Sequence, residues 1–138
     1  MIIFNSEEID FSLLYQQQIS NWITETIVSE GQFLGEISYI FCNDIYLHKI
    51  NLDYLQHDTF TDIITFDYSE KNIISSDIFV SVERVKENAD EFNNTFDDEL
   101  HRVLIHGILH LLGYKDKTPQ EVKIMRTKED YYLTLLSV

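Results

Sequence analysis

The sequence predicts one α+β domain in which a mixed sheet of about four strands packs with several helices. Two features support this fold class. Segments in which apolar and polar residues alternate, as in strands, are interspersed with segments of helical apolar spacing. The 138 residues are 44% hydrophobic and include only four glycines and one proline, which suffices for one core and leaves no evident linker. We therefore treat residues 1–138 as a single domain.

The N-terminal part of the chain predicts a short strand, a helix and a longer strand. Residues 1–4 form the short strand. Asp10 can cap a helix that runs to about Glu30, and Gly31 is placed to end it. Residues 33–42 alternate apolar and polar side chains and form the longer strand. The helix is expected to turn six apolar side chains inward: Phe11, Leu14, Ile19, Trp22, Ile23 and Ile27.

A second helix and two further strands are expected in the middle of the chain. Asn43 is placed to cap a helix that ends near Leu55. After a polar loop, residues 62–68 and 73–80 form two segments rich in β-branched and aromatic residues, joined by a polar turn. The apolar residues of the helix occupy four positions: Ile45, Leu47, Ile50 and Tyr54.

Three helices are expected in the C-terminal part. The first spans residues 82–92, and the second runs from Thr95 to Leu112 with acidic residues in its first turn. Residues 118–121 form a capping box that opens the third helix, with proline at the first helical position. The apolar positions of this last helix are Val122, Ile124, Met125, Tyr131, Tyr132, Leu133 and Leu136.

The net charge of −14 is unusual for a protein that binds nucleic acid, since most such proteins are basic. The charge is, however, unevenly distributed. Residues 1–70 contain twelve acidic residues and one lysine, whereas residues 102–138 contain six basic and four acidic residues. The C-terminal part is therefore locally positive, unless its lysines simply pair along a solvated helix.

The single cysteine, Cys42, lies in an alternating apolar segment and is predicted to be a small buried hydrophobic residue. One cysteine excludes an intrachain disulfide and fits a reducing cytoplasm. No apolar segment reaches membrane-spanning length, and the N-terminus lacks the basic start of a signal peptide. We therefore expect a cytoplasmic protein without a membrane partner.

Residues 102–116 contain the side chains with the clearest chemical role. His106 and His110 are four residues apart on a predicted helix, so their imidazoles lie on the same side of it. Asp116 can join them only if the chain turns back, which Gly113 permits. Such a zincin-like helix could hold one zinc ion and leave a fourth position for water, as in catalytic zinc sites. Nickel, manganese or iron would also accept these ligands.

Gly107 distinguishes this segment from the metallopeptidase motif H-E-x-x-H-x-x-G-x-x-H. The spacing is kept, but glycine stands where the motif has the glutamate that acts as general base, which disfavours peptide hydrolysis. Glycine inside a helix costs roughly 1 kcal/mol of stability relative to alanine. We therefore expect either a close approach of backbone or substrate at Gly107, or tight packing of the helix.

Four segments of the sequence resemble the YbeY family of bacterial endoribonucleases. Residues 99–114 closely match its signature H-G-x-L-H-L-x-G-Y-D-H. The other matches lie at residues 50–66, at residues 76–81, and at the M-x-x-x-E spacing of Met125 and Glu129. The resemblance covers nearly the whole chain and implies a metal-dependent endoribonuclease domain over residues 1–138.

The resemblance also implies the site and the partners of the protein. By position, the metal ligands would be His106, His110 and Asp116, with a catalytic zinc ion. The substrate would be single-stranded ribosomal RNA, particularly the three-prime end of small-subunit RNA, with a further role in ribosome quality control. Partners would be the small ribosomal subunit and either a basic ribosomal protein, which would suit the acidic half, or a ribosome-assembly GTPase.

The sequence departs from the family pattern at the site. The usual third histidine ligand is Asp116, the aspartate before it is Lys115, and an arginine of the family is replaced by Leu55. Loss of that arginine removes a partner for a phosphate group. We hypothesise that Lys115, Arg102 or His57 supplies the missing positive charge, and we include Lys115 among the candidate catalytic residues. Lys115 could equally be a solvated loop residue.

Other polar side chains receive weaker assignments. Asp62 and Asp77 lie in matched strands and are expected to orient ligands or water, unless they cap turns and strand edges. His101 lies on another face of the metal helix and is expected at the surface. His48 and His57 are not assigned to the metal.

Two other classes of function are consistent with these residues. One is a binding factor in ribosome biogenesis whose metal is mainly structural, which the acidic body and Leu55 favour. The other is a metal-dependent hydrolase of a different substrate, for which Gly107 makes peptide the least favoured choice. Cleavage of single-stranded RNA by the metal-loaded protein would distinguish the ribonuclease from both.

Overall fold

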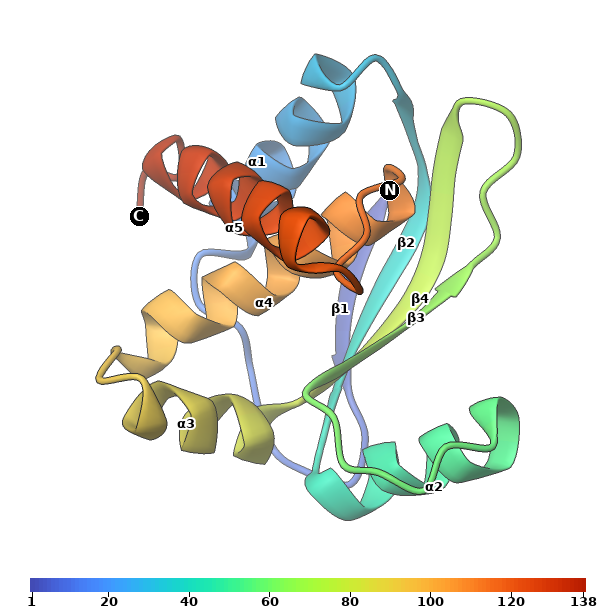
Figure 1. Cartoon of the computed structure of the whole chain (residues 1–138), viewed down its shortest axis with the longest axis vertical. Helices are drawn as coiled ribbons and strands as arrows, with labels where there is room; N and C mark the ends of the chain where they lie inside the picture. The colour runs from blue at the N-terminus through green and yellow to red at the C-terminus, as the bar shows by residue number, and fades with distance from the viewer.

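The computed structural model describes residues 1–138 and contains one mixed sheet of four strands (Figure 1). The strands lie in the order β1-β2-β4-β3. Their bounds are β1 (Ile2–Ser6), β2 (Phe33–Cys42), β3 (Ile63–Asp67) and β4 (Ile73–Ser81). β2 pairs in parallel with β1 and with β4, whereas β3 pairs antiparallel to β4. The mixed sheet of four strands predicted from the sequence is therefore confirmed.

Five helices accompany the sheet, as the single α+β domain requires. They are α1 (Gln16–Ser29), α2 (Asp44–Leu55), α3 (Val82–Glu91), α4 (Phe96–Leu111) and α5 (Pro119–Thr134). α1 and α4 pack against one face of the sheet, and α5 packs on α4. α2 lies at one end of the opposite face, against β3 and β4 (Figure 1). None of these helices combines the length and the apolar character that crossing a membrane would require.

The sheet separates two hydrophobic cores. The larger core lies on the side of α1, α4 and α5 and includes Phe41 from β2 and Leu104 from α4. The smaller core lies on the α2 side and consists of Cys42, Leu47, Ile50 and Ile64. Successive residues of a strand point to opposite faces, so the adjacent residues Phe41 and Cys42 belong to different cores. Cys42 is fully buried, as predicted.

The predicted helix starts in the second half of the chain are confirmed by their caps. The side chains of Asn43, Thr95 and Thr118 each accept a hydrogen bond from the backbone N–H three residues later, at 2.8, 3.1 and 3.1 Å. The Oε1 atom of Glu121 accepts the backbone N–H of Thr118 at 3.0 Å, which completes the capping box. After α4, Gly113 has a φ of 106°, a conformation that glycine adopts readily.

The first helix is shorter than predicted. α1 starts directly after Tyr15 rather than at Asp10, because Tyr15 has a left-handed conformation with a φ of 60° and interrupts the helix. Leu14, which was expected to face the core, is 63% exposed, and its neighbour Leu13 is buried instead. The predicted end is confirmed, since Gly31 follows the helix with a φ of 81°.

Several of the apolar residues named on α2 and α5 are exposed in the structure. On α2, Ile45 and Tyr54 are 77% and 72% exposed, because this helix covers only one end of the sheet and buries a narrow stripe. On α5, Met125 and Tyr132 are buried in the larger core. The exposed positions of α5 are Val122, Ile124 and Tyr131. Helical spacing alone does not determine how wide the buried face is.

Candidate metal centre

α4 is the central helix of the structure and carries both predicted histidine ligands. It packs against β3, β4, α1, α3 and α5. His106 and His110 lie on its half-buried side, whereas the rest of the helix is largely enclosed. Its residues without exposed surface include Leu104, Ile105, Ile108 and Leu109. The two imidazoles are therefore attached to a rigid element.

Gly107 allows α4 to pack closely against the sheet. A Cβ atom at this position would lie 2.8 Å from Cδ1 of Ile63 and 3.4 Å from Cγ2 of Thr65, both on β3. A larger residue would therefore have to push the helix or the Ile63 side chain away. Of the two explanations expected from the sequence, the structure supports tight helix packing.

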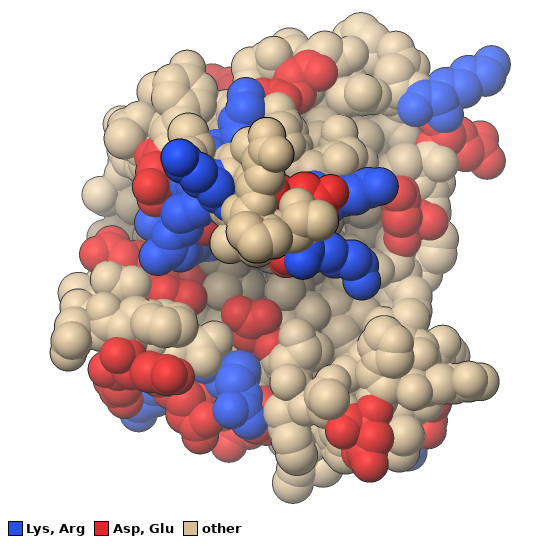
Figure 2. Space-filling view, viewed as in Figure 1, with Lys and Arg blue, Asp and Glu red and all other residues tan.

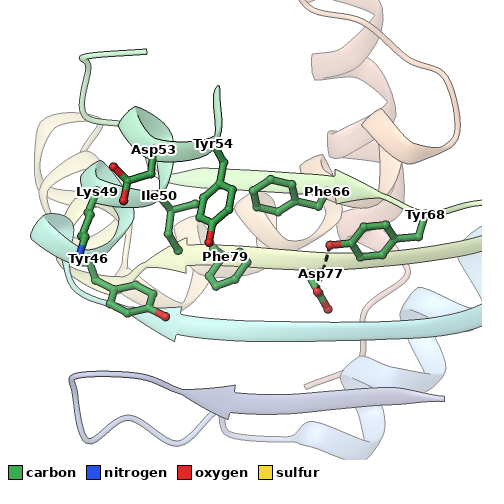
Figure 3. Close-up of a pocket in the computed structure, with 9 residues that line it drawn as sticks. All are labelled: Tyr46, Lys49, Ile50, Asp53, Tyr54, Phe66, Tyr68, Asp77 and Phe79. Carbon is green, nitrogen blue, oxygen red and sulfur yellow. Dashed lines mark hydrogen bonds between the residues drawn. The ribbon is translucent and has the colours of Figure 1, made fainter. Parts of the chain in front are cut away.

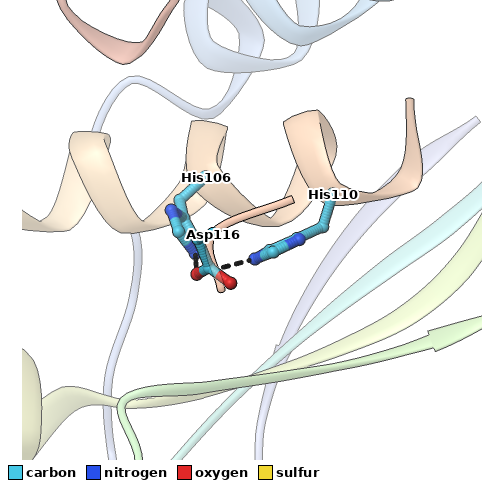
Figure 4. Close-up of side chains that lie close together, drawn as sticks. All are labelled: His106, His110 and Asp116. Carbon is cyan, nitrogen blue, oxygen red and sulfur yellow. Dashed lines mark hydrogen bonds and ion pairs between the residues drawn. The ribbon is translucent and has the colours of Figure 1, made fainter. Parts of the chain in front are cut away.

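The three predicted ligands converge in space (Figure 4). The ring centroids of His106 and His110 are 4.5 Å apart. The Oδ2 atom of Asp116 lies 3.4 Å from Nε2 of His106 and 3.2 Å from Nε2 of His110. All three ligand atoms lie within 4.8 Å of one another. The left-handed turn at Gly113 returns the chain after α4, as the sequence predicted, and brings Asp116 beside the helix.

Hydrogen bonds at the far side of each ring orient the imidazoles. The Nδ1 atom of His106 donates to Oε2 of Glu129 at 2.6 Å, and Nδ1 of His110 donates to the backbone oxygen of Tyr114 at 3.0 Å. Both oxygens can only accept, so Nδ1 of each ring carries a proton, and in the neutral form of the ring Nε2 has its lone pair on the side of Asp116. Three electron-pair donors then point at one place, which fits a divalent cation bound between them.

Glu129 is a residue beside the candidate ligands whose contact with them the sequence did not reveal. It is only 4% exposed and lies on α5, where it receives hydrogen bonds from His106 and from Nη1 of Arg102, the latter at 2.8 Å. The M-x-x-x-E spacing of Met125 and Glu129 belongs to the family resemblance but does not by itself predict a role for Glu129. The available signal was that Glu129 lies one helical turn after Met125, which faces the core.

The electrostatics of these groups follow from burial and mutual pairing. Burial raises the pKa of Glu129, but the hydrogen bonds and charges of His106 and Arg102 outweigh this and lower the pKa below its usual value. Burial lowers the pKa of His106, yet its carboxylate neighbours, chiefly Glu129, raise the pKa overall. Glu129 is thus an ionised partner that makes the His106 ring more basic.

A cavity of about 250 Å³ lies beside the ligands, and we call it the metal pocket. It is lined by Asp62, Glu99, Arg102, Val103, His106, Asp116, Val122, Met125, Arg126 and Glu129. Asp62 therefore lies where the sequence placed it, next to the metal ligands. Burial raises the pKa of Asp62, partly offset by the nearby imidazole of His106. A carboxyl group with a raised pKa holds a proton more readily than an exposed one, which favours proton exchange with a reactant.

Asp77 does not reach the metal pocket, so its predicted role at the ligands is wrong. On β4 the neighbouring residue Ile78 is buried in the core on the α4 side, so Asp77 points to the opposite face. There its Oδ2 atom accepts a hydrogen bond from the hydroxyl group of Tyr68 at 3.3 Å.

The candidate cations differ in their surroundings. Arg102 lines the metal pocket, but both ends of its guanidinium group bind carboxylates, on Glu129 and, at 2.7 Å, on Asp130. Lys115 is exposed beside Asp116 and forms no ion pair. His57 lies in the exposed loop after α2 and does not line the metal pocket.

His101 is buried rather than at the surface, which corrects the prediction. It is 9% exposed, and burial lowers the pKa of its imidazole. Leu133 and Leu136, at the C-terminal end of the chain, line a cavity together with His101 and cover this side of α4. Residue spacing along α4 could not predict that residues near the C-terminal end of the chain lie against His101.

A second cavity, of about 490 Å³, lies on the α2 side of the sheet (Figure 3). We call it the aromatic pocket. Its lining consists of Tyr46, Lys49, Ile50, Asp53, Tyr54, Phe66, Tyr68, Asp77 and Phe79. The Tyr68–Asp77 contact is the hydrogen bond drawn between these side chains, and no set of them converges as the metal ligands do.

Comparison with known proteins connects this site with a family. The family model described as endoribonuclease YbeY matches residues 2–137. The endoribonuclease YbeY of Flavobacterium johnsoniae is 56% identical over 138 residues, which cover 100% of this chain and 99% of that protein. The endoribonuclease YbeY of Christiangramia forsetii is 56% identical over 99% of this chain and 95% of its own. A solution structure from Thermotoga maritima matches with a TM-score of 0.67 and 30% identity, covering 96% of this chain and 87% of that chain.

Proposed function

Since this chain belongs to the YbeY family of endoribonucleases, we propose that it hydrolyses single-stranded RNA at a divalent metal ion held by His106, His110 and Asp116. Membership in a family of enzymes favours a hydrolase of phosphodiester bonds over a binding factor with a structural metal. The observation that supports the proposed site most directly is the convergence of two Nε2 atoms and one carboxylate oxygen within 4.8 Å of one another, beside the pocket that His106 and Asp116 line.

The residues around the proposed site would have different roles in the reaction. A bound ion would activate a water molecule and polarise the phosphodiester group. Glu129 and the backbone oxygen of Tyr114 hold the two imidazoles in the orientation that binding requires. Asp62 is the carboxyl group placed to accept a proton from the attacking water and to return it to the leaving oxygen. Gly107 contributes packing rather than chemistry.

Zinc is the ion we propose, because two imidazoles and one carboxylate are a ligand set found at catalytic zinc sites. Nickel, manganese and iron remain alternatives with the same ligands. Elemental analysis of protein purified without an affinity tag would identify the ion. A stoichiometry near one zinc per chain is expected, and a different ion at that stoichiometry would contradict the zinc assignment.

The decisive test of the site compares two histidine variants on a single-stranded RNA. His110→Ala removes a ligand and is expected to reduce cleavage to the level of protein treated with a chelator. His48→Ala is the matched control, since His48 lies on α2, binds Asp58 and does not line the metal pocket. Equal cleavage by the wild type and by His110→Ala would indicate a contaminating nuclease and refute the proposal.

The proposed physiological substrate is ribosomal RNA, at the three-prime end of the small-subunit RNA. Its support is the family signature carried by residues 99–114. The test offers the purified protein a precursor of that RNA end, an unrelated single strand and a duplex of the same sequence. Preferential cleavage of the precursor is expected. Equal cleavage of all three would contradict both the single-strand preference and the ribosomal target, and a partner on the small subunit would then have to supply the specificity.

A further inference from the structure

The metal pocket is lined by two arginines, which differ in how closely carboxylates hold them. Arg102 binds Glu129 and Asp130 through its two terminal nitrogens and is 18% exposed. Arg126 also lines the pocket, but its side chain is 58% exposed and forms no hydrogen bond within the protein. Its nearest carboxylate contact is Oε1 of Glu129 at 3.7 Å, which is beyond hydrogen-bond distance.

More acidic than basic side chains line the metal pocket, which disfavours binding of an anionic substrate unless a cation is present. The carboxyl groups that line it outnumber the two guanidinium groups; they belong to Asp62, Glu99, Asp116 and Glu129. A bound divalent ion would offset part of this negative charge at the ligands, and a guanidinium group at the mouth of the pocket would add attraction for an approaching phosphodiester group. Since Arg102 is held by two carboxylates, Arg126 is the guanidinium group left to meet it.

The position of Arg126 on α5 directs it to the site. Val122, Met125, Arg126 and Glu129 are spaced by three or four residues, and all four line the metal pocket. Figure 2 shows that Lys and Arg side chains gather around α5, in front of a hollow in the surface. Leu55, the last residue of α2, does not line the metal pocket, and α2 supplies no cation to its lining.

We propose that Arg126 forms, at the mouth of the metal pocket, a subsite for a backbone phosphate of the RNA strand. This inference rests on the proposed function. In it, Arg126 on α5 supplies the positive charge that is lost where Leu55 replaces the family's arginine, and Lys115, Arg102 and His57 do not. A guanidinium group suits this role because its planar donors can bind two phosphate oxygens at once.

The test compares Arg126→Ala and Arg126→Lys with Lys123→Ala. Lys123 is a matched control because it is an exposed cation on the same helix, but it lines a different cavity with Pro119 and Thr127. Binding of a fluorescent single-stranded RNA is followed by anisotropy at several salt concentrations, with a chelator present so that the RNA stays intact. Cleavage by the metal-loaded proteins supplies KM and kcat, and circular dichroism checks the fold.

We expect Arg126→Ala to raise both Kd and KM about tenfold and to lower the slope of log Kd against log salt by about 0.7, the value for one phosphate contact on a single strand. Arg126→Lys should restore the salt slope but only part of the affinity, because lysine keeps the charge and loses the planar donors. Lys123→Ala should leave KM unchanged.

The inference is overturned if Arg126→Ala binds and cleaves RNA as Lys123→Ala does. It is also overturned if Arg126→Ala lowers only the melting temperature, since the effect would then be structural. Failure of the proposed function looks different: the wild type would cleave no faster than His110→Ala. The anisotropy comparison would still test Arg126 in that case.

Discussion

The metal pocket and the aromatic pocket lie on opposite faces of one sheet, and they differ in the polarity of their linings and in whether ligand atoms converge beside them. The aromatic pocket is the larger, about 490 Å³ against about 250 Å³, and six of its nine lining residues are hydrophobic. Three of the ten residues that line the metal pocket are hydrophobic, and the others include two arginines, a histidine and four acids. Volume and apolar character would select the aromatic pocket, whereas convergence of ligand atoms selects the metal pocket.

The reason for the difference is the number of elements that meet at each site. At the metal pocket, α4, α5 and the loop that joins them bring polar side chains together in partial burial, so each must find a partner. At the aromatic pocket only α2 covers the sheet, and its charged residues remain free to reach water. Partial burial of paired charges therefore distinguishes the candidate metal centre from the aromatic pocket.

The largest expected effect concerns two aspartates on opposite faces. Asp62→Asn should reduce kcat about 100-fold, because a group that transfers protons contributes at least this much, while zinc content stays unchanged. Asp77→Asn, in the aromatic pocket, is the matched control and should cleave RNA at the wild-type rate. Single-turnover kinetics with measured metal content would check this, and equal rates for the two variants would remove Asp62 from the mechanism.

The second prediction concerns the carboxylate behind His106. Glu129→Gln should weaken zinc binding about tenfold, since loss of a group that orients a ligand has effects of this size. Asp130→Asn is the control, because Asp130 binds the same Arg102 but is 59% exposed and touches no ligand. Competition with a chromophoric chelator measures both affinities. Unchanged zinc affinity in Glu129→Gln would show that the 2.6 Å contact with His106 does not hold the metal site.

The third prediction concerns the stability of the protein and not its activity. Phe79→Ala in the aromatic pocket should lower the free energy of unfolding by about 2 kcal/mol, because its half-buried ring packs edge-on against Phe66 at 5.8 Å. RNA cleavage per folded molecule should remain that of the wild type. Urea denaturation and the cleavage assay together test this separation. A variant that lost activity without losing stability would show that the aromatic pocket also serves the reaction.

The smallest expected effect concerns Glu30. It follows α1 and connects this helix with Tyr114, in the loop between α4 and α5, and with α5 itself. It accepts hydrogen bonds from Tyr114 at 2.6 Å, from Lys128 at 3.2 Å and from the hydroxyl group of Tyr132. Burial raises the pKa of Glu30, but these donors outweigh it and lower the pKa below 4.5. Glu30→Gln should therefore cost about 1 kcal/mol of stability at neutral pH.

The sign of the pH dependence follows from the lowered pKa of Glu30. The stabilisation is present above the unfolded pKa and is lost as the pH falls through the folded one. The difference in melting temperature between wild type and Glu30→Gln should accordingly shrink as the pH is lowered below about 4.5. A difference that stayed constant with pH would show that the contact does not depend on the charge of Glu30.

Residues close together in the chain made most of the fold and site predictable. The caps at Asn43, Thr95 and Thr118 act on N–H groups three residues away, so the sequence displays the complete interaction. The same is true of His106 and His110 on one helix side. The predicted start of α1 is wrong because Tyr15, which is 52% exposed, adopts a left-handed conformation that is uncommon for residues other than glycine and that the sequence does not signal.

Sequence alone predicted the three candidate ligands, the left-handed turn at Gly113 and the alternation of strands and helices. The tertiary structure was needed to show that Glu129, 23 residues after His106, binds its ring, and that the Arg126 guanidinium group forms no hydrogen bond and only a 3.7 Å ion pair with Glu129. The physical reason is that local hydrogen bonds depend on spacing along one helix or turn. Pairing between helices depends instead on the angle and distance at which α5 crosses α4, which the packing of both against the shared core determines.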